Sequence, residues 1–127
     1  MSQVVFDSSA VIALLHGEPG ANLVSTLALD AAISAVNAAE VQTRLVQKGA
    51  DPRRAWEGIV TSVEVIVPFD AAMAEAAGSL VAVTQPYGLS LGDRACLALA
   101  MTLRSPVYTA DRAWAKLQVG VEIRLIR

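Results

Sequence analysis

Four acidic side chains occupy positions from which they could bind a divalent cation together. Each follows an apolar run or opens an apolar helical segment, and they are Asp7, Glu40, Asp93 and Asp111. Carboxylates that are brought together in a partly dry site repel one another strongly unless a cation joins them. An all-oxygen ligand set suits Mg²⁺, with Mn²⁺ possible, whereas a chain with one His and one Cys lacks the usual zinc ligands.

Two of these acids also have a structural interpretation as helix caps. Asp7 stands between an apolar run and a helical segment, and Asp111 opens a short helical segment near the end of the chain. The hydroxyls of Ser8 and Thr109 lie near them in sequence, so they could support and orient metal ligands, or simply act as turn and cap groups.

The other two acids lie at capping-box spacing from a preceding polar residue. Asp93 follows Ser90 by three residues, and Glu40 follows Asn37 by three. Glu40 also has Arg44 four residues further on, a spacing that favours an ion pair on a helix. Capping and metal binding therefore both remain open for these positions.

The apolar pattern predicts the elements that position the acids. Residues 3–6 are typical of a buried parallel strand and are followed by a helix over about 8–15. Further strands are expected at 31–35, 63–69, 107–109 and 121–126, with helices between them. This alternation predicts an α/β fold: one domain over residues 1–127, with a mainly parallel, twisted sheet of about five strands and helices on both faces.

Right-handed crossovers would bring the acids to one edge of that sheet. Asp7 and Asp111 follow strands directly, and Glu40 is expected in the first turn of the helix after the second strand. Asp93 requires that the helix expected from Asp70 to about residue 83 ends at the opposite edge. Residues 84–91 would then cross the domain, which is feasible because eight extended residues reach ~26–29 Å.

Charge and composition limit the possible functions. Ten Lys and Arg face twelve Asp and Glu, for a net charge of −2, so the chain cannot attract a nucleic acid by charge alone. No uncharged apolar run approaches the ~20 residues of a membrane span. The amino-terminal residues have no basic start ahead of an apolar core, so we expect no signal peptide. With Cys96 as the one cysteine, we expect a cytoplasmic protein without a membrane. A hydrophobic content of 54% favours a covered subunit or partner surface.

Four segments together resemble a known family. Residues 4–9 (VVFDSS), 34–41 (SAVNAAEV), 89–93 (LSLGD) and 108–114 (YTADRAW) are similar, in order and spacing, to the motifs of PIN-domain ribonucleases, specifically VapC-type toxins of VapBC toxin–antitoxin pairs. The family often has a further acid after the fourth motif, where this chain has Arg112, Ala113 and Trp114.

The resemblance implies Mg²⁺-dependent hydrolysis of phosphodiester bonds in single-stranded or looped RNA. By this similarity Asp7, Glu40, Asp93 and Asp111 would hold one or two Mg²⁺ ions, with Asp7 and Asp93 as direct ligands and the other two acting partly through water. It further implies a cognate antitoxin, a homodimer and a higher assembly with the antitoxin. Arg94 and Arg112 flank two of the acids and could contact phosphates. We favour the interpretation that they are surface or ion-paired residues.

Two other functions remain open. A phosphoacceptor signalling module would also gather acids around Mg²⁺; Asp70 could be its acceptor, but residues 121–127 contain no Lys for the last strand. A PIN-like interaction domain without activity is the second, and the presence of all four acids argues against it.

Overall fold

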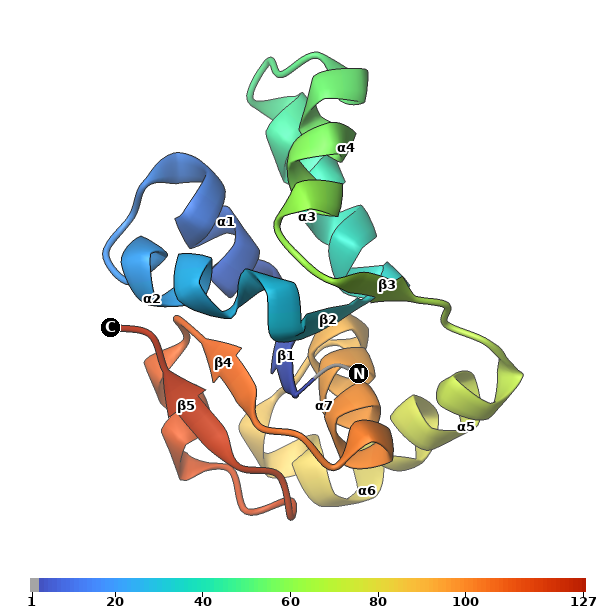
Figure 1. Cartoon of the computed structure of the whole chain (residues 1–127). Helices are drawn as coiled ribbons and strands as arrows, with labels where there is room; N and C mark the ends of the chain where they lie inside the picture. Colours follow the sequence, from blue (N-terminus) through green and yellow to red (C-terminus); the bar gives the residue numbers. More distant parts are fainter. Residues whose placement is uncertain (1–2) are drawn as a thin grey trace.

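A parallel sheet of five strands forms the centre of the molecule in a computed structural model, which describes residues 3–127 (Figure 1). The strands are β1 (Val4–Phe6), β2 (Ala31–Ser34), β3 (Val65–Val67), β4 (Val107–Thr109) and β5 (Ile123–Leu125). Their order is β3-β2-β1-β4-β5, and every neighbouring pair is parallel. The predicted parallel α/β fold is therefore confirmed, with β1 in the middle of the sheet.

Helices connect the strands and cover the sheet. They are α1 (Ser8–His16), α2 (Ala21–Leu27), α3 (Ala35–Gln47), α4 (Pro52–Thr61), α5 (Ala71–Ser79), α6 (Val81–Thr84) and α7 (Leu91–Leu103), with short 3₁₀ segments η1 (Ala28–Asp30), η2 (Gln85–Tyr87) and η3 (Arg112–Lys116). Helices α3 and α4 form a hairpin that projects away from the body (Figure 1). Within residues 3–127, no helix has the length and apolar character that a bilayer crossing needs.

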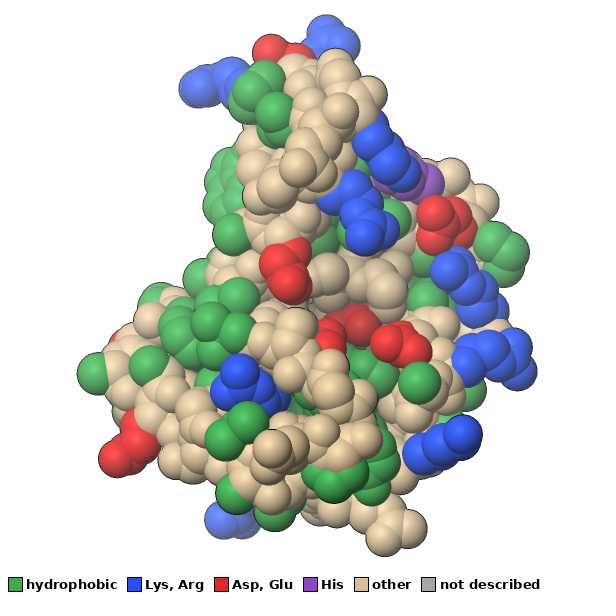
Figure 2. Space-filling model, turned by 180° about the vertical axis from the view of Figure 1, so that it is seen from behind, with side chains coloured by type: hydrophobic (Ala, Val, Ile, Leu, Met, Phe, Trp, Pro, Cys, Tyr) green, Lys and Arg blue, Asp and Glu red, His purple; other side chains and the backbone are tan. Residues whose placement is uncertain are grey.

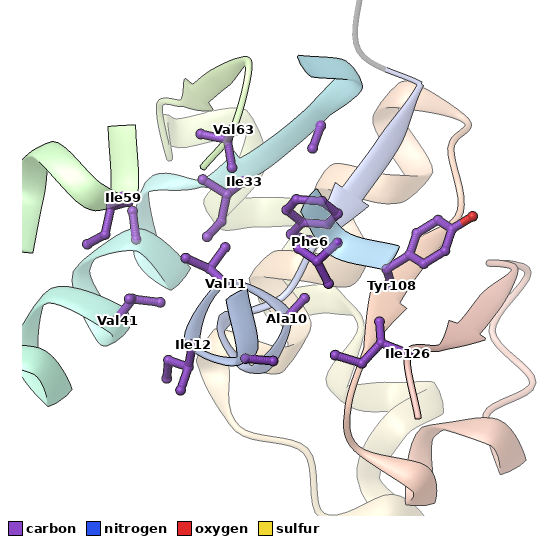
Figure 3. Packing of buried hydrophobic residues seen from close by; sticks show 14 of the residues in the cluster. Phe6, Ala10, Val11, Ile12, Ile33, Val41, Ile59, Val63, Tyr108 and Ile126 are labelled. Carbon is purple, nitrogen blue, oxygen red and sulfur yellow. The ribbon is translucent and has the colours of Figure 1, made fainter. Parts of the chain in front are cut away.

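The two faces of the sheet carry separate hydrophobic clusters because side chains alternate along each strand. Phe6 and Ile33 point into the first cluster and pack with side chains of the α1–α4 side, including Val11 and Ile59 (Figure 3). Val5, which lies between Val4 and Phe6, belongs instead to the second cluster with side chains of α5 and α7. Helices on both faces are thus confirmed.

The prediction of one long helix after Asp70 is wrong. This stretch forms two helices, α5 and α6, that meet at Leu80. Gly78 and Ser79, just before that point, are weak helix formers. The next stretch is not an extended crossing either, since Gln85–Tyr87 forms η2. Pro86 suits the opening of that 3₁₀ turn, and Gly88 ends it in a left-handed conformation with φ of 66°.

Candidate active site

The four predicted acids line one cleft of about 210 Å³. Asp7 follows β1, Glu40 projects from α3, Asp93 from the first turn of α7, and Asp111 follows β4. Acidic side chains gather at the hollow in the middle of the face shown in Figure 2, below the projecting lobe. The structure therefore brings together residues that are as far apart in the sequence as Asp7 and Asp111.

Asp7 is buried and tied to its surroundings through both carboxylate oxygens. Oδ1 accepts hydrogen bonds from the Ala10 amide (3.0 Å) and the Ser9 hydroxyl (2.7 Å), so Asp7 does cap α1. Oδ2 accepts a 2.6 Å hydrogen bond from the Thr109 hydroxyl, which in turn accepts one from the Asp111 amide (3.0 Å). Thr109 thus links two of the four acids.

Burial raises the pKa of Asp7 because it removes water from the charged carboxylate. Hydrogen bonds from Thr109, Ser9 and the Ala10 amide oppose that rise, and the nearby charge of Asp93 adds to it. A bound cation would relieve both the desolvation and the repulsion, so the electrostatics of Asp7 favour a cation in the cleft.

The pKa of Cys96 is also affected by the negative charges of the cleft. The thiol is buried on α7, as expected for a packed small side chain. Burial raises its pKa well above the ordinary value, and the charges of Asp7, Asp93 and Glu40 raise it further. Cys96 is therefore a neutral core residue close to three of the acids.

Glu40 is held by hydrogen bonds from α1 and from its own helix, α3. Its Oε1 accepts a 2.6 Å hydrogen bond from the Ser8 hydroxyl at the start of α1 and a 2.9 Å hydrogen bond from the Asn37 amide, one turn earlier on α3. The same Asn37 amide nitrogen donates to the Gly92 carbonyl of α7 (3.0 Å), which joins α3 to α7. The position of this carboxylate therefore depends on three helices.

Gly92 leaves the space that the Glu40 carboxylate occupies. A Cβ built at Gly92 would overlap that carboxylate, with the Glu40 carboxyl carbon at 2.6 Å and Oε1 at 2.7 Å. No other side chain fits here without moving Glu40, so the absence of a Cβ lets the carboxylate rest against the beginning of α7.

Asp93 and Asp111 both act as caps while lining the cleft. Asp93 forms a full capping box with Ser90: its carboxylate accepts from the Ser90 amide (3.0 Å), and its amide donates to the Ser90 hydroxyl (3.1 Å). Asp111 caps η3 by accepting from the Ala113 amide (3.0 Å). Capping uses one oxygen of each carboxylate and leaves acceptor capacity for another ligand.

The predicted position of Glu40 in its helix is wrong. Ser34, the last residue of β2, caps α3 by accepting from the Val36 amide (3.2 Å), so the helix begins at Ala35 and Glu40 lies in its second turn. Glu40 still reaches the cleft because helical side chains lean toward the amino end. The Glu40–Arg44 ion pair is also not formed among the described residues.

The sequence interpretation missed the role of Asn37, which it took for a cap. The side chain is 1% exposed, and its Oδ1 has no hydrogen-bond partner within the described part of the chain. One available signal was Ser34, which is also a good helix cap. Because Ser34 caps α3, the side chain of Asn37 is free to bond elsewhere. Gly92, beside Asp93, was the second position with an unrecognised role.

The carboxylates surround the cleft but do not yet form a coordination sphere. No three of the Asp, Glu, His and Cys side chains of residues 3–127 are grouped closely enough to share one metal ion. The donor set nevertheless fits a hard cation, since it consists of carboxylate oxygens around a buried acid whose pKa is raised.

Comparison with known proteins identifies the family. The sequence model of the PIN domain family matches residues 4–120, so the chain belongs to this family. PIN proteins are generally nucleases that use divalent metal ions. A search of curated proteins found no match.

Solved structures with the same fold include toxin–antitoxin proteins. A toxin–antitoxin complex from Klebsiella pneumoniae has 23% identity and a TM-score of 0.70, over 95% of this chain and 100% of that chain. DNA-bound VapBC from Salmonella typhimurium has 19% identity and a TM-score of 0.73, over 100% of both chains. VapC20 of Mycobacterium tuberculosis, a toxin that cleaves the Sarcin-Ricin loop, has 20% identity and a TM-score of 0.72, over 94% of this chain and 99% of that chain. The predicted resemblance to PIN-domain toxins is thus supported by the fold.

Proposed function

We propose that this chain, over residues 1–127, is an endoribonuclease toxin of the VapC type that depends on Mg²⁺, with Mn²⁺ as a possible substitute. The main observation in support is that one cleft at the edge of the sheet is lined by all four acids, Asp7, Glu40, Asp93 and Asp111. The PIN family match and the toxin VapC20 among the solved relatives support hydrolysis of RNA.

The acids have different parts in this proposal. Asp7 and Asp93 are direct ligands, whereas Glu40 and Asp111 act partly through water, in keeping with the spread of the carboxylates around the cleft. Mg²⁺ bound there would supply the Lewis acidity that phosphodiester hydrolysis requires. Thr109 holds the Asp7 carboxylate through its hydroxyl, and Ser8 holds that of Glu40, so both are positioning residues.

Partners follow from the relatives and from the surface. The Klebsiella and Salmonella structures are complexes with an antitoxin, so we infer a cognate antitoxin, a homodimer and a higher assembly of both. Exposed apolar side chains on the projecting hairpin, Trp56 and Val60 of α4 and Val46 of α3, support a covering partner. A toxin that cleaves RNA would act in the cytoplasm.

Cleavage by purified protein tests the function. Wild type should cleave single-stranded or looped RNA with Mg²⁺ and not with EDTA, while Asp7→Asn and Asp93→Asn should be inactive with an unchanged circular dichroism spectrum. Sequencing of RNA 5′ ends after induction in cells, beside the Asp7→Asn variant, would identify the target. Cleavage at the wild-type rate by either variant would contradict the metal mechanism.

The alternative functions give different results in solution. Asp70 caps α5 and lines another hollow with Met73 and Leu99, so its position does not support a phosphoacceptor role. A stable acyl phosphate after incubation with a small phosphodonor would favour that role regardless. Calorimetry that detects no Mg²⁺ binding, together with no cleavage, would favour an inactive interaction domain.

A further inference from the structure

Arg44 is an unpaired cation at the junction of two hollows. It lines the acidic cleft, and it also lines a larger groove of about 690 Å³ along α3. The side chain is exposed and, among residues 3–127, takes part in no hydrogen bond or ion pair, although Glu40 lies one turn away. Arg94, which flanks Asp93, is not available in this way because it donates to the Ala77 carbonyl (2.9 Å).

The groove has the composition of a surface for a flat ring. Small side chains of α3, including Ala35 and Ala39, belong to its lining, and Phe69, which follows β3, belongs to the same lining. Phe69 is half-buried, with part of its ring packed against the second hydrophobic cluster. The volume of the groove falls in the range of about 300–1,000 Å³ that is usual for ligand pockets.

Few groups in the groove could read a base edge. The Thr43 hydroxyl already donates to the Ala39 carbonyl (2.8 Å), and Oε1 of Glu40 accepts from Ser8 and Asn37. The Gln47 amide is the other polar side chain in this lining besides Arg44. A ligand would therefore be held by stacking on Phe69 and by the charge of Arg44, two interactions that tolerate any base.

The geometry points to a nucleotide subsite: we infer that this groove binds the nucleotide next to the bond that is cut, with a backbone phosphate on Arg44 and a base on Phe69. The inference rests on the proposed function and adds the subsite through which RNA is held. It also explains how an acidic cleft in a chain of net charge −2 retains a polyanion, because Arg44 offers a positive charge where groove and cleft meet.

An RNA strand fits these observations better than a protein partner. The groove is continuous with the cleft, since Glu40 and Arg44 belong to the lining of both. A strand whose scissile phosphate lies in the cleft must pass its next nucleotide over one of the adjoining surfaces, and this surface carries a cation and an aromatic ring. A second copy of the chain seated in the groove is the competing occupant, and the mass in solution of the Arg44 variant distinguishes it from RNA.

Steady-state cleavage of a short fluorescent single-stranded RNA tests the subsite. Arg44→Gln and Phe69→Leu should each raise KM about tenfold, in the range of a lost phosphate contact or base stack, with kcat within about twofold of wild type. Arg53→Gln is the matched control, because it removes one exposed arginine from α4, outside both hollows, and should leave KM and kcat unchanged.

RNA affinity as a function of salt gives a second readout without turnover. Fluorescence anisotropy in the Asp7→Asn background should show that Arg44→Gln reduces the slope of log affinity against log salt by ~0.7, the value for one phosphate contact on a single strand. Arg53→Gln should leave that slope unchanged.

Three results would overturn the inference. If wild type cleaves RNA but Arg44→Gln retains its KM and salt slope, the subsite is wrong while the nuclease function stands. If Arg44→Gln changes the mass in solution at unchanged KM, the groove is a contact between copies of the chain. If wild type cleaves no RNA with Mg²⁺ or Mn²⁺, the proposed function and the subsite fail together.

Discussion

The two best-defined acids of the cleft are held in opposite ways. Asp7 is buried, stands directly after the central strand and accepts hydrogen bonds through both oxygens. Glu40 is exposed, lies in the second turn of α3 and depends on Ser8, Asn37 and the space at Gly92. Backbone topology places the first acid, and side-chain contacts between helices place the second.

This difference has an energetic consequence. Burial makes the charge of Asp7 costly, so the metal-free fold is less stable with that carboxylate ionised. Glu40 remains in contact with water and can adjust to a ligand. We therefore expect that removing the charge of Asp7 abolishes function but stabilises the metal-free fold. For Glu40 we expect function to depend on Ser8, Asn37 and Gly92, each of which can be substituted separately.

The largest effect is expected for Asp7→Asn. Loss of this carboxylate should reduce Mg²⁺ affinity by more than ~100-fold, beyond the usual effect of removing a group that only orients a ligand. Asn is as good a helix cap as Asp, so the start of α1 should persist. Isothermal titration with Mg²⁺ measures the affinity, and thermal unfolding in EDTA measures the stability.

The stability of the same variant should depend on pH with a definite sign. Because the folded state raises the pKa of Asp7, proton binding at this group stabilises the fold below the unfolded-state pKa, and that contribution is lost as pH rises through the raised value. Asp7→Asn cannot ionise, so in EDTA its stability relative to wild type should improve as pH rises through that interval. Glu40→Gln is the control, because it changes an exposed acid of the same cleft and leaves the buried carboxylate of Asp7 in place. A wild type that gains stability over Asp7→Asn with rising pH would reverse the comparison.

The two acids also show what a sequence can predict. Asp7 was recognisable because the apolar run 4–6 ends at it, and parallel strands deliver their carboxyl ends to one edge. The same rule placed Asp111, which follows β4, at that edge of the sheet. Local capping chemistry was predictable for Asp93, since Ser90 and Asp93 are three residues apart.

The support of Glu40 was not predictable in that way. The bridge from Asn37 to Gly92 spans 55 positions and exists only after α3 and α7 have packed together. The break between α5 and α6 also escaped prediction, since the Ala-rich stretch from 71 favours one continuous helix and the cost of Gly78 is small beside tertiary packing. Contacts between side chains of distant elements are a product of packing, and a single sequence does not encode them in any local pattern.

An intermediate effect is expected for Asn37→Ala. The Glu40 carboxylate would lose its amide donor, and the buried Gly92 carbonyl would lose its hydrogen bond, so Mg²⁺ affinity should fall ~10- to 100-fold and stability by ~1–3 kcal/mol. Ser8→Ala is the matched control: it removes one donor from the same carboxylate without breaking the link between α3 and α7. Its effect on stability should be smaller, measured for both variants by urea unfolding. Equal losses of stability in the two variants would contradict the bridging role of Asn37.

The smallest effect is expected for Gly92→Ala, and its two readouts should move in different directions. The new Cβ would displace the flexible end of Glu40, so RNA cleavage should fall ~10-fold, at the lower limit for an orienting contact. Alanine is also the better residue inside a helix, by ~0.5–1 kcal/mol, so the free energy of unfolding should be unchanged or higher. Gly78→Ala in α5 is the control, because nothing lies within 4 Å of a Cβ there and activity should stay at the wild-type level. If Gly92→Ala lost stability and activity in parallel, the glycine would serve the packing of α7 rather than the placement of Glu40, and only Ser8 and Asn37 would remain as the neighbours that set the position of this acid.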